Sequence, residues 1–472
     1  MALIVYTSLK GENGTPCYAL GVRRQVEELL HRGEYDEAYE LLLAAAERRL
    51  APRAVVARAL LDLAEFYSLY GEAEAEPWQA ALSEARSSWA EVANLPVYQA
   101  LAFELAALRG EEARPPEASE PRARYHLAQG LAYLGQPLQA LGLLPEAASL
   151  PGFLRTRVYT LRARLLESLG DLAGAARAHR RAAGLARGKE KLWSLLDAAA
   201  LWLDAGEPGE ARDDLKEAEQ LLAGAEVGDR ATFHYLMART ELASGNPELA
   251  APQIARAEGL EAAGGGLSHG TAMVRAQIHQ QLGQHEPARG AYREAARRAR
   301  EGDLPYIWHE WGVAELDAGQ LLEAETLLSR AAASESYPYR AQALADLAEV
   351  YYRLGNGPDA EEAARRSLSL NPTPAAHLVL GNRAYDVGHW DEALAHYRAA
   401  TALAREGDHD WVTAAEMTVD VLAQMGYPDP AEVAELAERV LPYLPASDDW
   451  RETLRGYALK ARELAGKNRL LN

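Results

Sequence analysis

The chain has 472 residues, of which 49% are hydrophobic and 25% are charged, a balance typical of a folded protein and not of a disordered one. Its formal net charge of −20 argues against a protein that binds nucleic acid through a basic face. The single cysteine, Cys17, excludes an intrachain disulfide, and no apolar run approaches the roughly 20 residues needed to span a bilayer.

The first segment, residues 1–18, differs from everything that follows it. The stretch MALIVYTSLK has a short apolar run with no basic residue ahead of it, so it does not resemble a signal peptide. We therefore expect a cytoplasmic protein that does not enter the membrane. Because residues 1–18 carry no repeat motif, we expect them to be either extended against the first helices or disordered.

From residue 19 onward a short pattern recurs, in which an alanine follows a glycine by five residues. In the clearest copy, Leu380 to Ala400, apolar residues three to four positions apart precede Gly388 and resume after it. This spacing predicts two amphipathic helices joined by a tight turn. Other copies have the pairs Gly33 and Ala38, Gly135 and Ala140, Gly170 and Ala175, Gly206 and Ala211, Gly245 and Ala250, Gly283 and Ala288, Gly319 and Ala324, and Gly355 and Ala360.

Small residues recur at a second position, seven residues before the turn glycine. Examples are Ala348 before Gly355 and Gly381 before Gly388. A small side chain lets two helices cross closely, and a glycine can end the first helix in the left-handed conformation. A lone hairpin cannot bury both of its faces, so we expect the copies to stack into one array.

The clearest copy resembles the tetratricopeptide repeat family. The matching positions are Leu380, Gly381, Gly388, Trp390, Glu392, Ala393, Tyr397 and Ala400, and Pro372 closes the copy before it. Most other copies keep the small residues and lose the aromatic ones. The resemblance covers residues 19–446 and implies an all-α fold, a right-handed α-α superhelix of about eleven helical hairpins.

Three places interrupt the array, and a different element follows it. Irregular loops are predicted near residues 72–77, 109–122 and 262–270, where proline, acidic residues or the run from Gly264 to Gly266 break the pattern. Residues 447–472 begin with Ser447, a good helix cap, and carry charge along one side. We expect them to form a C-terminal capping helix.

Motifs that carry chemistry are not evident. The sequence has no phosphate-binding loop, no nucleophile elbow and no zinc-protease motif. His309 and Glu310 lie between two tryptophans at repeat-core positions, where packing explains the residues better than catalysis. We therefore predict no catalytic residue, no metal site and no cofactor, and so a chain that is not an enzyme.

The resemblance also implies a binding groove lined by the first helix of each hairpin. In the N-terminal and middle repeats the corresponding residues are Arg23, Arg24, Tyr125, His126, Gln129, Arg157, Arg164, Tyr235 and Arg239. In the later repeats they are Tyr306, His309, Asp317, Asp346, Glu349, Tyr352, Asn382, Tyr385, Asp386, Glu416 and Asp420. Asn382 matches one position of the chaperone-binding carboxylate clamp, but Leu378 stands where that clamp has lysine, so the clamp is not supported.

The hypothesis for function is a protein-interaction scaffold or adaptor that binds a protein or peptide in this groove. Acidic residues dominate the groove positions after Tyr306, which favours a basic segment there. The alternative is a regulatory array that senses a peptide or ligand in a bacterial signalling or transcription system. No nucleic-acid or membrane partner is expected, and the sequence does not identify the partner, the pathway or the oligomeric state.

Overall fold

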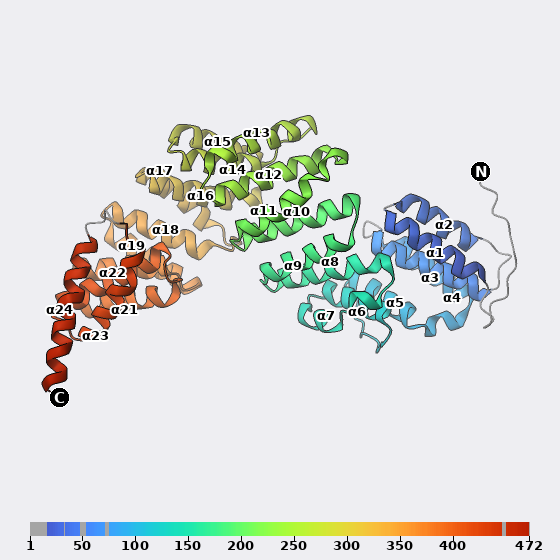
Figure 1. Ribbon diagram of the computed structural model, residues 1–472, viewed down its shortest axis with the longest axis horizontal. Coiled ribbons are helices and arrows are strands. Elements are labelled where there is room, and N and C mark those ends of the chain that lie inside the picture. The colour runs from blue at the N-terminus through green and yellow to red at the C-terminus, as the bar shows by residue number, and fades with distance from the viewer. Residues whose placement is uncertain (1–16, 33, 48–52, 71–74, 446–449, 472) are drawn as a thin grey trace. The chain divides into compact units, whose positions relative to one another are not determined.

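The computed structural model describes residues 17–32, 34–47, 53–70, 75–445 and 450–471. These residues form 24 α-helices and no strand (Figure 1), which confirms the predicted all-α fold. The chain divides into two compact units, Met1–Gly266 and Leu267–Asn472. The division lies at the glycine run Gly264–Gly266, inside the range 262–270.

The bounds of the helices define the repeats. The first unit contains α1 (Cys17–Arg32), α2 (Tyr35–Glu47), α3 (Arg53–Tyr70), α4 (Ala75–Ser88), α5 (Pro96–Leu108), α6 (Pro121–Tyr133), α7 (Pro137–Leu143), α8 (Gly152–Ser168), α9 (Leu172–Leu185), α10 (Gly188–Asp204), α11 (Pro208–Glu219), α12 (Val227–Ala243) and α13 (Pro247–Ala263). The second contains α14 (His269–Gln281), α15 (His285–Arg298), α16 (Leu304–Asp317), α17 (Leu321–Ala333), α18 (Arg340–Arg353), α19 (Gly357–Leu370), α20 (Pro374–Asp386), α21 (Trp390–Leu403), α22 (His409–Gln424), α23 (Pro430–Val440) and α24 (Trp450–Leu471).

Glycine ends the first helix of most hairpins, as the sequence predicts. Gly170 has φ +80° and its N–H donates to the Glu167 carbonyl, while the N–H of Asp171 donates to the Leu166 carbonyl. These two bonds satisfy carbonyls at the end of α8 in the left-handed cap that glycine adopts without strain. The carboxylate of Asp171 then caps α9 by accepting from the N–H of Gly174 at 2.7 Å.

The helix crossings are built on small residues. Ala324, Ala360 and Ala393 are fully buried, in agreement with the repeat register. A Cβ atom added to Gly381 would lie 2.6 Å from the ring of Tyr397, so only glycine fits where α20 crosses α21. The sequence pattern therefore indicates where two helices pack closely as well as where the chain turns.

The irregular regions differ in part from expectation. No helix is formed between the end of α5 at Leu108 and the start of α6 at Pro121, so the last two residues of the loop expected at 109–122 belong to α6. The loop expected at 72–77 is wrong for residues 75–77: α4 begins at Ala75, and Pro77 lies in its first turn, where a missing N–H costs nothing. Similarly, α14 already begins at His269, inside the loop expected at 262–270.

The two chain ends are described only in part. Residues 1–16 lie outside the described residues, and Cys17 and Tyr18 already belong to α1, although the sequence assigned them to the leading segment. Ser447, the expected cap of the last helix, also lies outside them. The C-terminal helix itself is present as α24, which packs against α22 and α23.

Within each unit the helices form two layers. In the second unit the first helices of consecutive hairpins, α16, α18, α20, α22 and then α24, contact one another, and the second helices make no comparable contacts among themselves. The first helices therefore form one layer and pack more closely with one another than the second helices do. We call the side of these first helices that faces away from the second helices the inner face. In the first unit the corresponding helices are α1, α3, α5, α6, α8, α10 and α12.

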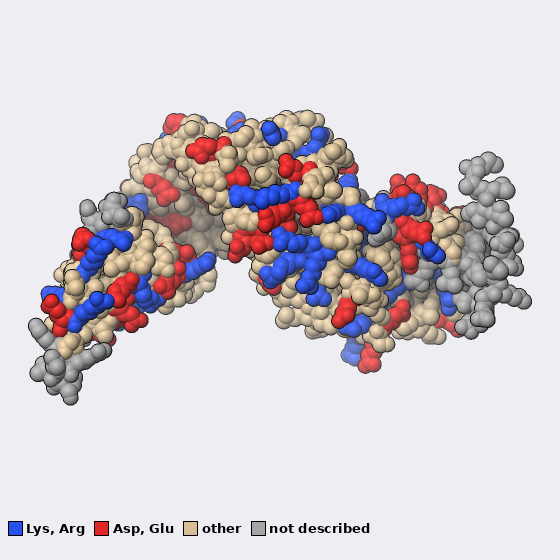
Figure 2. All heavy atoms as spheres, viewed as in Figure 1, with Lys and Arg blue, Asp and Glu red and all other residues tan. Residues whose placement is uncertain are grey.

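Ion pairs reinforce the stacking between repeats. Arg289 of α15 donates through Nε to Glu315 of α16 at 2.7 Å, and Arg180 of α9 donates to Asp214 of α11 at 2.7 Å. Figure 2 shows basic and acidic side chains interspersed on the side of each unit that is turned toward the viewer. Much of the charge is thus paired locally.

Candidate functional site: the inner faces of the two units

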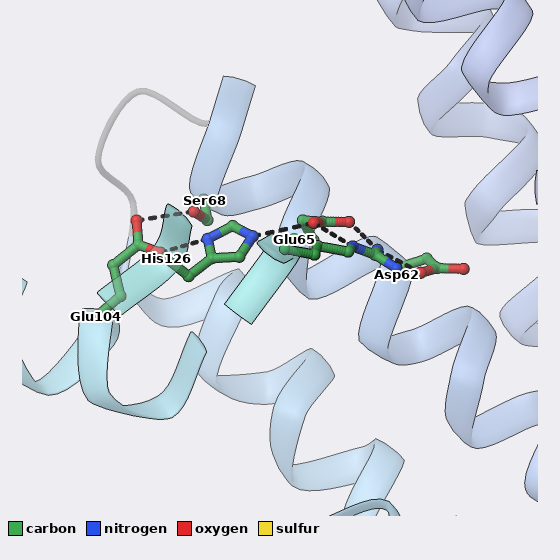
Figure 3. A network of polar contacts seen from close by, with 6 residues as sticks. Asp62, Glu65, Ser68, Glu104 and His126 are labelled. Atoms are coloured by element: carbon green, nitrogen blue, oxygen red, sulfur yellow. Dashed lines mark hydrogen bonds and ion pairs between the residues drawn. The ribbon is translucent and has the colours of Figure 1, made fainter. Parts of the chain in front are cut away.

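The inner face of the first unit holds a buried network of charged side chains (Figure 3). Three helices supply it, and its members are Asp62, Glu65 and Ser68 of α3, Glu104 of α5, and Arg122 and His126 of α6.

Two cations hold the carboxylates of this network. Arg122 donates through Nη2 to Asp62 at 2.7 Å and makes a two-pronged contact with Glu65, in which the Nε bond is 2.5 Å. His126 lies between Glu65, 3.0 Å from Nε2, and Glu104, 2.7 Å from Nδ1. Since carboxylate oxygens accept hydrogen bonds, both ring nitrogens carry protons when both carboxylates are ionised.

Electrostatics keep the network charged although it is buried. Burial alone would lower the pKa of His126, but Glu104 and Glu65 outweigh it and raise this pKa to about 9. Burial would raise the pKa of Glu65, yet the Arg122 guanidinium holds it well below its usual range. Burial raises the pKa of Glu104, against the opposing effects of His126 and Ser68.

The cavity beside this network in the described part of the chain is too small for a ligand. The adjoining cavity has a volume of about 20 Å³ and is lined by Val26, Leu30, Phe66 and Phe153 together with members of the network. That volume accommodates about one water molecule. The network therefore fastens α3, α5 and α6 together, and its role is structural.

The first two helices cover part of this inner face, since Val26, Leu30 and Leu42 lie beside Glu65 and Arg122. Helix α1 contacts α8, and the Tyr35 hydroxyl of α2 donates to Glu190 of α10. The Tyr35 ring lies 4.7 Å from that of Tyr70, and the guanidinium of Arg157 lies 4.5 Å from the centre of the Tyr70 ring. Aromatic and charged side chains thus fill the space that an open groove would need.

Several residues expected in the groove of the first unit are buried and therefore inaccessible to a partner. Tyr125, His126 and Gln129 are buried, so the expectation that they face a partner is wrong for this structure. Arg157 is half-buried, and Arg164 donates to Gln129 at 3.1 Å. Arg24 is exposed and pairs with Glu28, while the side chain of Arg23 lies outside the described residues.

Farther along the first unit the predicted residues are more open. Tyr235 and Arg239, both half-buried on α12, pair with each other, the guanidinium lying 5.8 Å from the ring centre. Arg239 also donates to Asp204 of α10 at 2.7 Å.

In the second unit most of the predicted residues line the inner face. Tyr306, Asp317 and Asp386 are exposed. Those that are half-buried are His309, Asp346, Glu349, Tyr352, Asn382, Tyr385 and Glu416. Asp420 is the exception: it is 2% exposed because the hydroxyls of Tyr385 and Tyr457 donate to it at 2.6 and 2.9 Å. Its expected contact with a partner is therefore wrong for this structure.

Carboxylates on this face stay partly exposed and can accept further hydrogen bonds. Asp346 accepts from His309 at 2.7 Å, Glu349 accepts from Arg353 at 2.7 Å, and each carboxylate side chain remains 28% exposed. Asp386 lies 3.8 Å from Arg383 and is 43% exposed. Burial raises the pKa of Asp410 on α22, and the nearby charge of Asp346 raises it further. Acidic side chains therefore gather on this face, and each of the three named carboxylates has one basic neighbour yet stays partly exposed.

Five residues that shape the two faces were not predicted. Three are Glu65, Glu104 and Arg122. The signal for the first two was a carboxylate inside a largely apolar run: ALLDLAEFY, which holds Asp62 and Glu65, and LAFELAAL, which holds Glu104 alone. The others, Tyr337 and Tyr339, lie in the segment between α17 and α18, outside the first helices that the resemblance considers.

Two further properties concern the described part of the chain alone. Its residues contain no group of three or more His, Cys, Asp or Glu side chains placed to hold a metal ion. None of its helices is both long enough and apolar enough to cross a membrane.

With hairpins closed by a turn glycine and crossed at small residues, the chain is an all-α helical-repeat protein whose hairpins resemble tetratricopeptide repeats. No family model and no curated protein matches it. Solved structures that are similar include yeast Tom70, with 14% identity and a TM-score of 0.46 over 89% of this chain and 99% of that chain. Another is the Cut9–Hcn1 hetero-tetramer of the APC/C, with 13% identity and a TM-score of 0.43 over 94% of this chain and 96% of that chain.

A third similar structure, Pseudomonas aeruginosa pilF, has 17% identity and a TM-score of 0.40 over 49% of this chain and 99% of that chain. Likeness at this level says nothing about partner or activity.

Proposed function

We propose that the chain is a non-enzymatic scaffold whose second unit binds a basic segment of a partner protein on its inner face. The observation that carries the proposal is the combination of two exposed tyrosines, Tyr306 on α16 and Tyr339 just before α18, with partly exposed carboxylates on α18 and α20. Tyrosine supplies large contact area with little loss of conformational freedom, and it is enriched where proteins bind one another.

Electrostatics support a basic partner. Asp346, Glu349 and Asp386 lie on consecutive first helices, and the net charge of −20 adds to their field. A basic segment is attracted by this field, whereas an acidic or phosphorylated one is repelled. The first unit, whose inner face is largely filled, serves in this proposal as a rigid support. A cytoplasmic location remains a prediction from the sequence.

Site-specific photo-cross-linking in the full chain tests the proposal. A photoreactive residue at Glu349, on the inner face, is compared with one at Glu362, which is exposed on the second helix α19. We expect a protein adduct at Glu349 whose cross-linked peptide is basic, and no such adduct at Glu362. Equal adducts at both positions, or an acidic cross-linked peptide at Glu349, would contradict the proposal.

A further inference from the structure

Three tyrosines gather at one end of the second unit's inner face, and we call them the tyrosine patch: Tyr306, Tyr337 and Tyr339. Tyr306 belongs to α16, and the other two lie between α17 and α18. The ring of Tyr306 lies 4.8 Å from that of Tyr337 and 6.0 Å from that of Tyr339, in edge-to-face arrangements. Tyr337 is buried, while Tyr306 and Tyr339 remain 39% and 52% exposed.

The patch is held in place by the residues beneath it. The hydroxyl of Tyr337 lies 2.8 Å from Nδ1 of His309, whose Nε2 lies 2.7 Å from Asp346 of α18. The buried ring of Tyr337 then supports the two exposed rings by edge-to-face packing. A partner would therefore meet aromatic surfaces that are already ordered and lose less entropy on binding.

Carboxylates adjoin the aromatic rings. Glu310 lies four residues after Tyr306 on α16 and therefore on the same side of that helix. Asp346 is joined to Tyr337 through His309. Glu310 is exposed and accepts from Gln277 of α14 at 3.3 Å, so it keeps capacity for a stronger donor. Among the described residues, no cation–π contact involves the rings of the patch.

We propose that the tyrosine patch, with Glu310 and Asp346, binds an arginine side chain of the partner's basic segment. The inference rests on the proposed function and specifies which basic residue of the partner this site prefers. A guanidinium group is planar and weakly hydrated, so it stacks on a tyrosine ring while its N–H groups donate to carboxylates. Lysine has a compact and strongly hydrated charge, and it satisfies the carboxylates without the same stacking.

Two peptides of equal charge distinguish this proposal from simple attraction. Fluorescence anisotropy of the full chain with labelled octa-arginine and octa-lysine measures both affinities at the same ionic strength. We expect the wild-type chain to bind octa-arginine about tenfold more tightly than octa-lysine. The double variant Tyr306→Leu, Tyr339→Leu should lose this preference and bind octa-lysine as the wild type does.

Two control variants separate ring chemistry from damage to the fold. The variant Tyr306→Phe, Tyr339→Phe keeps the ring faces and should keep the preference for octa-arginine. Tyr443, which is 47% exposed elsewhere in the second unit, provides the matched control Tyr443→Leu, which should also keep it. If the leucine double variant does not fold, the phenylalanine variant decides: loss of the preference in that variant overturns a stacking site.

The outcomes keep this inference apart from the proposed function. Equal wild-type affinity for the two peptides overturns the arginine site and leaves a basic-segment scaffold standing. A leucine double variant that is folded and still prefers octa-arginine also overturns the site alone. Failure of the wild-type chain to bind either peptide overturns both proposals.

Discussion

His126 is a histidine held between two carboxylates with almost no access to water, and its titration is therefore coupled to the stability of the first unit. Its pKa in the folded state is raised to about 9 from an ordinary value near 6.5. A raised histidine pKa stabilises the fold fully below the unfolded value, and this stabilisation is lost as pH rises through the folded value. The raised pKa of Glu104 acts in the same direction.

We expect the first unit to lose stability between pH 6.5 and pH 9, by up to about 3 kcal/mol from the histidine alone. Hydrogen exchange of the amides in α3, α5 and α6 measures this loss locally. The variant His126→Gln should be less stable at pH 6.5, because buried Glu104 loses its cation and Glu65 keeps only Arg122, and should show a flatter dependence on pH. A wild-type chain whose exchange free energies stay constant over this range would show that His126 is neutral.

The burial of Asp420 could not be predicted from the sequence. Its position on a first helix is the same as that of residues that do face solvent. The hydroxyls of Tyr385, on α20, and Tyr457, on α24, converge on it across the stack and remove it from the surface. Tyr457 lies outside the array that the resemblance covers, so no repeat register could anticipate the contact.

A helical hairpin depends on the few positions where its two helices cross. Replacing Gly381 with alanine puts a Cβ atom 2.6 Å from the Tyr397 ring, which is itself fully buried. We expect Gly381→Ala to destabilise the second unit by about 1–3 kcal/mol through overpacking. A methyl group added to Gly290 in α15 would meet no atom within 4 Å, so Gly290→Ala should instead stabilise by about 0.5–1 kcal/mol. Urea unfolding of both variants measures the contrast, and effects of equal sign would contradict the assigned crossing.

The helices and turns were easier to predict from the sequence than the exposure of side chains, because a helix or turn depends on residues close together in the chain. The turn glycines and small residues report backbone conformation and helix spacing within one hairpin, so the array could be read from single copies. Burial of His126 depends instead on Glu65 of α3 and Glu104 of α5, which lie against it from two other helices. These contacts join residues far apart in the chain, and no motif within a repeat encodes them.

At the scale of the whole molecule the two units offer different inner faces. The first is filled by its own aromatic and charged side chains. The second keeps exposed tyrosines beside partly exposed carboxylates. The proposed division of labour, a supporting unit followed by a binding unit, rests on this difference and not on any motif for chemistry.

Selection of random displayed peptides by the full chain, followed by affinity measurement, tests the central claim most directly. The inner-face variant replaces Asp346, Glu349 and Asp386 by their amides. The control variant changes the charge equally through Glu323→Gln, Glu362→Gln and Asp391→Asn, all exposed on second helices. We predict that the selected peptides are basic and that added salt weakens their binding. The inner-face variant should bind them at least about tenfold more weakly, and the control variant should bind like wild type. Peptides that are not basic, or that bind the two variants equally well, would contradict a scaffold that holds a basic segment on its second inner face.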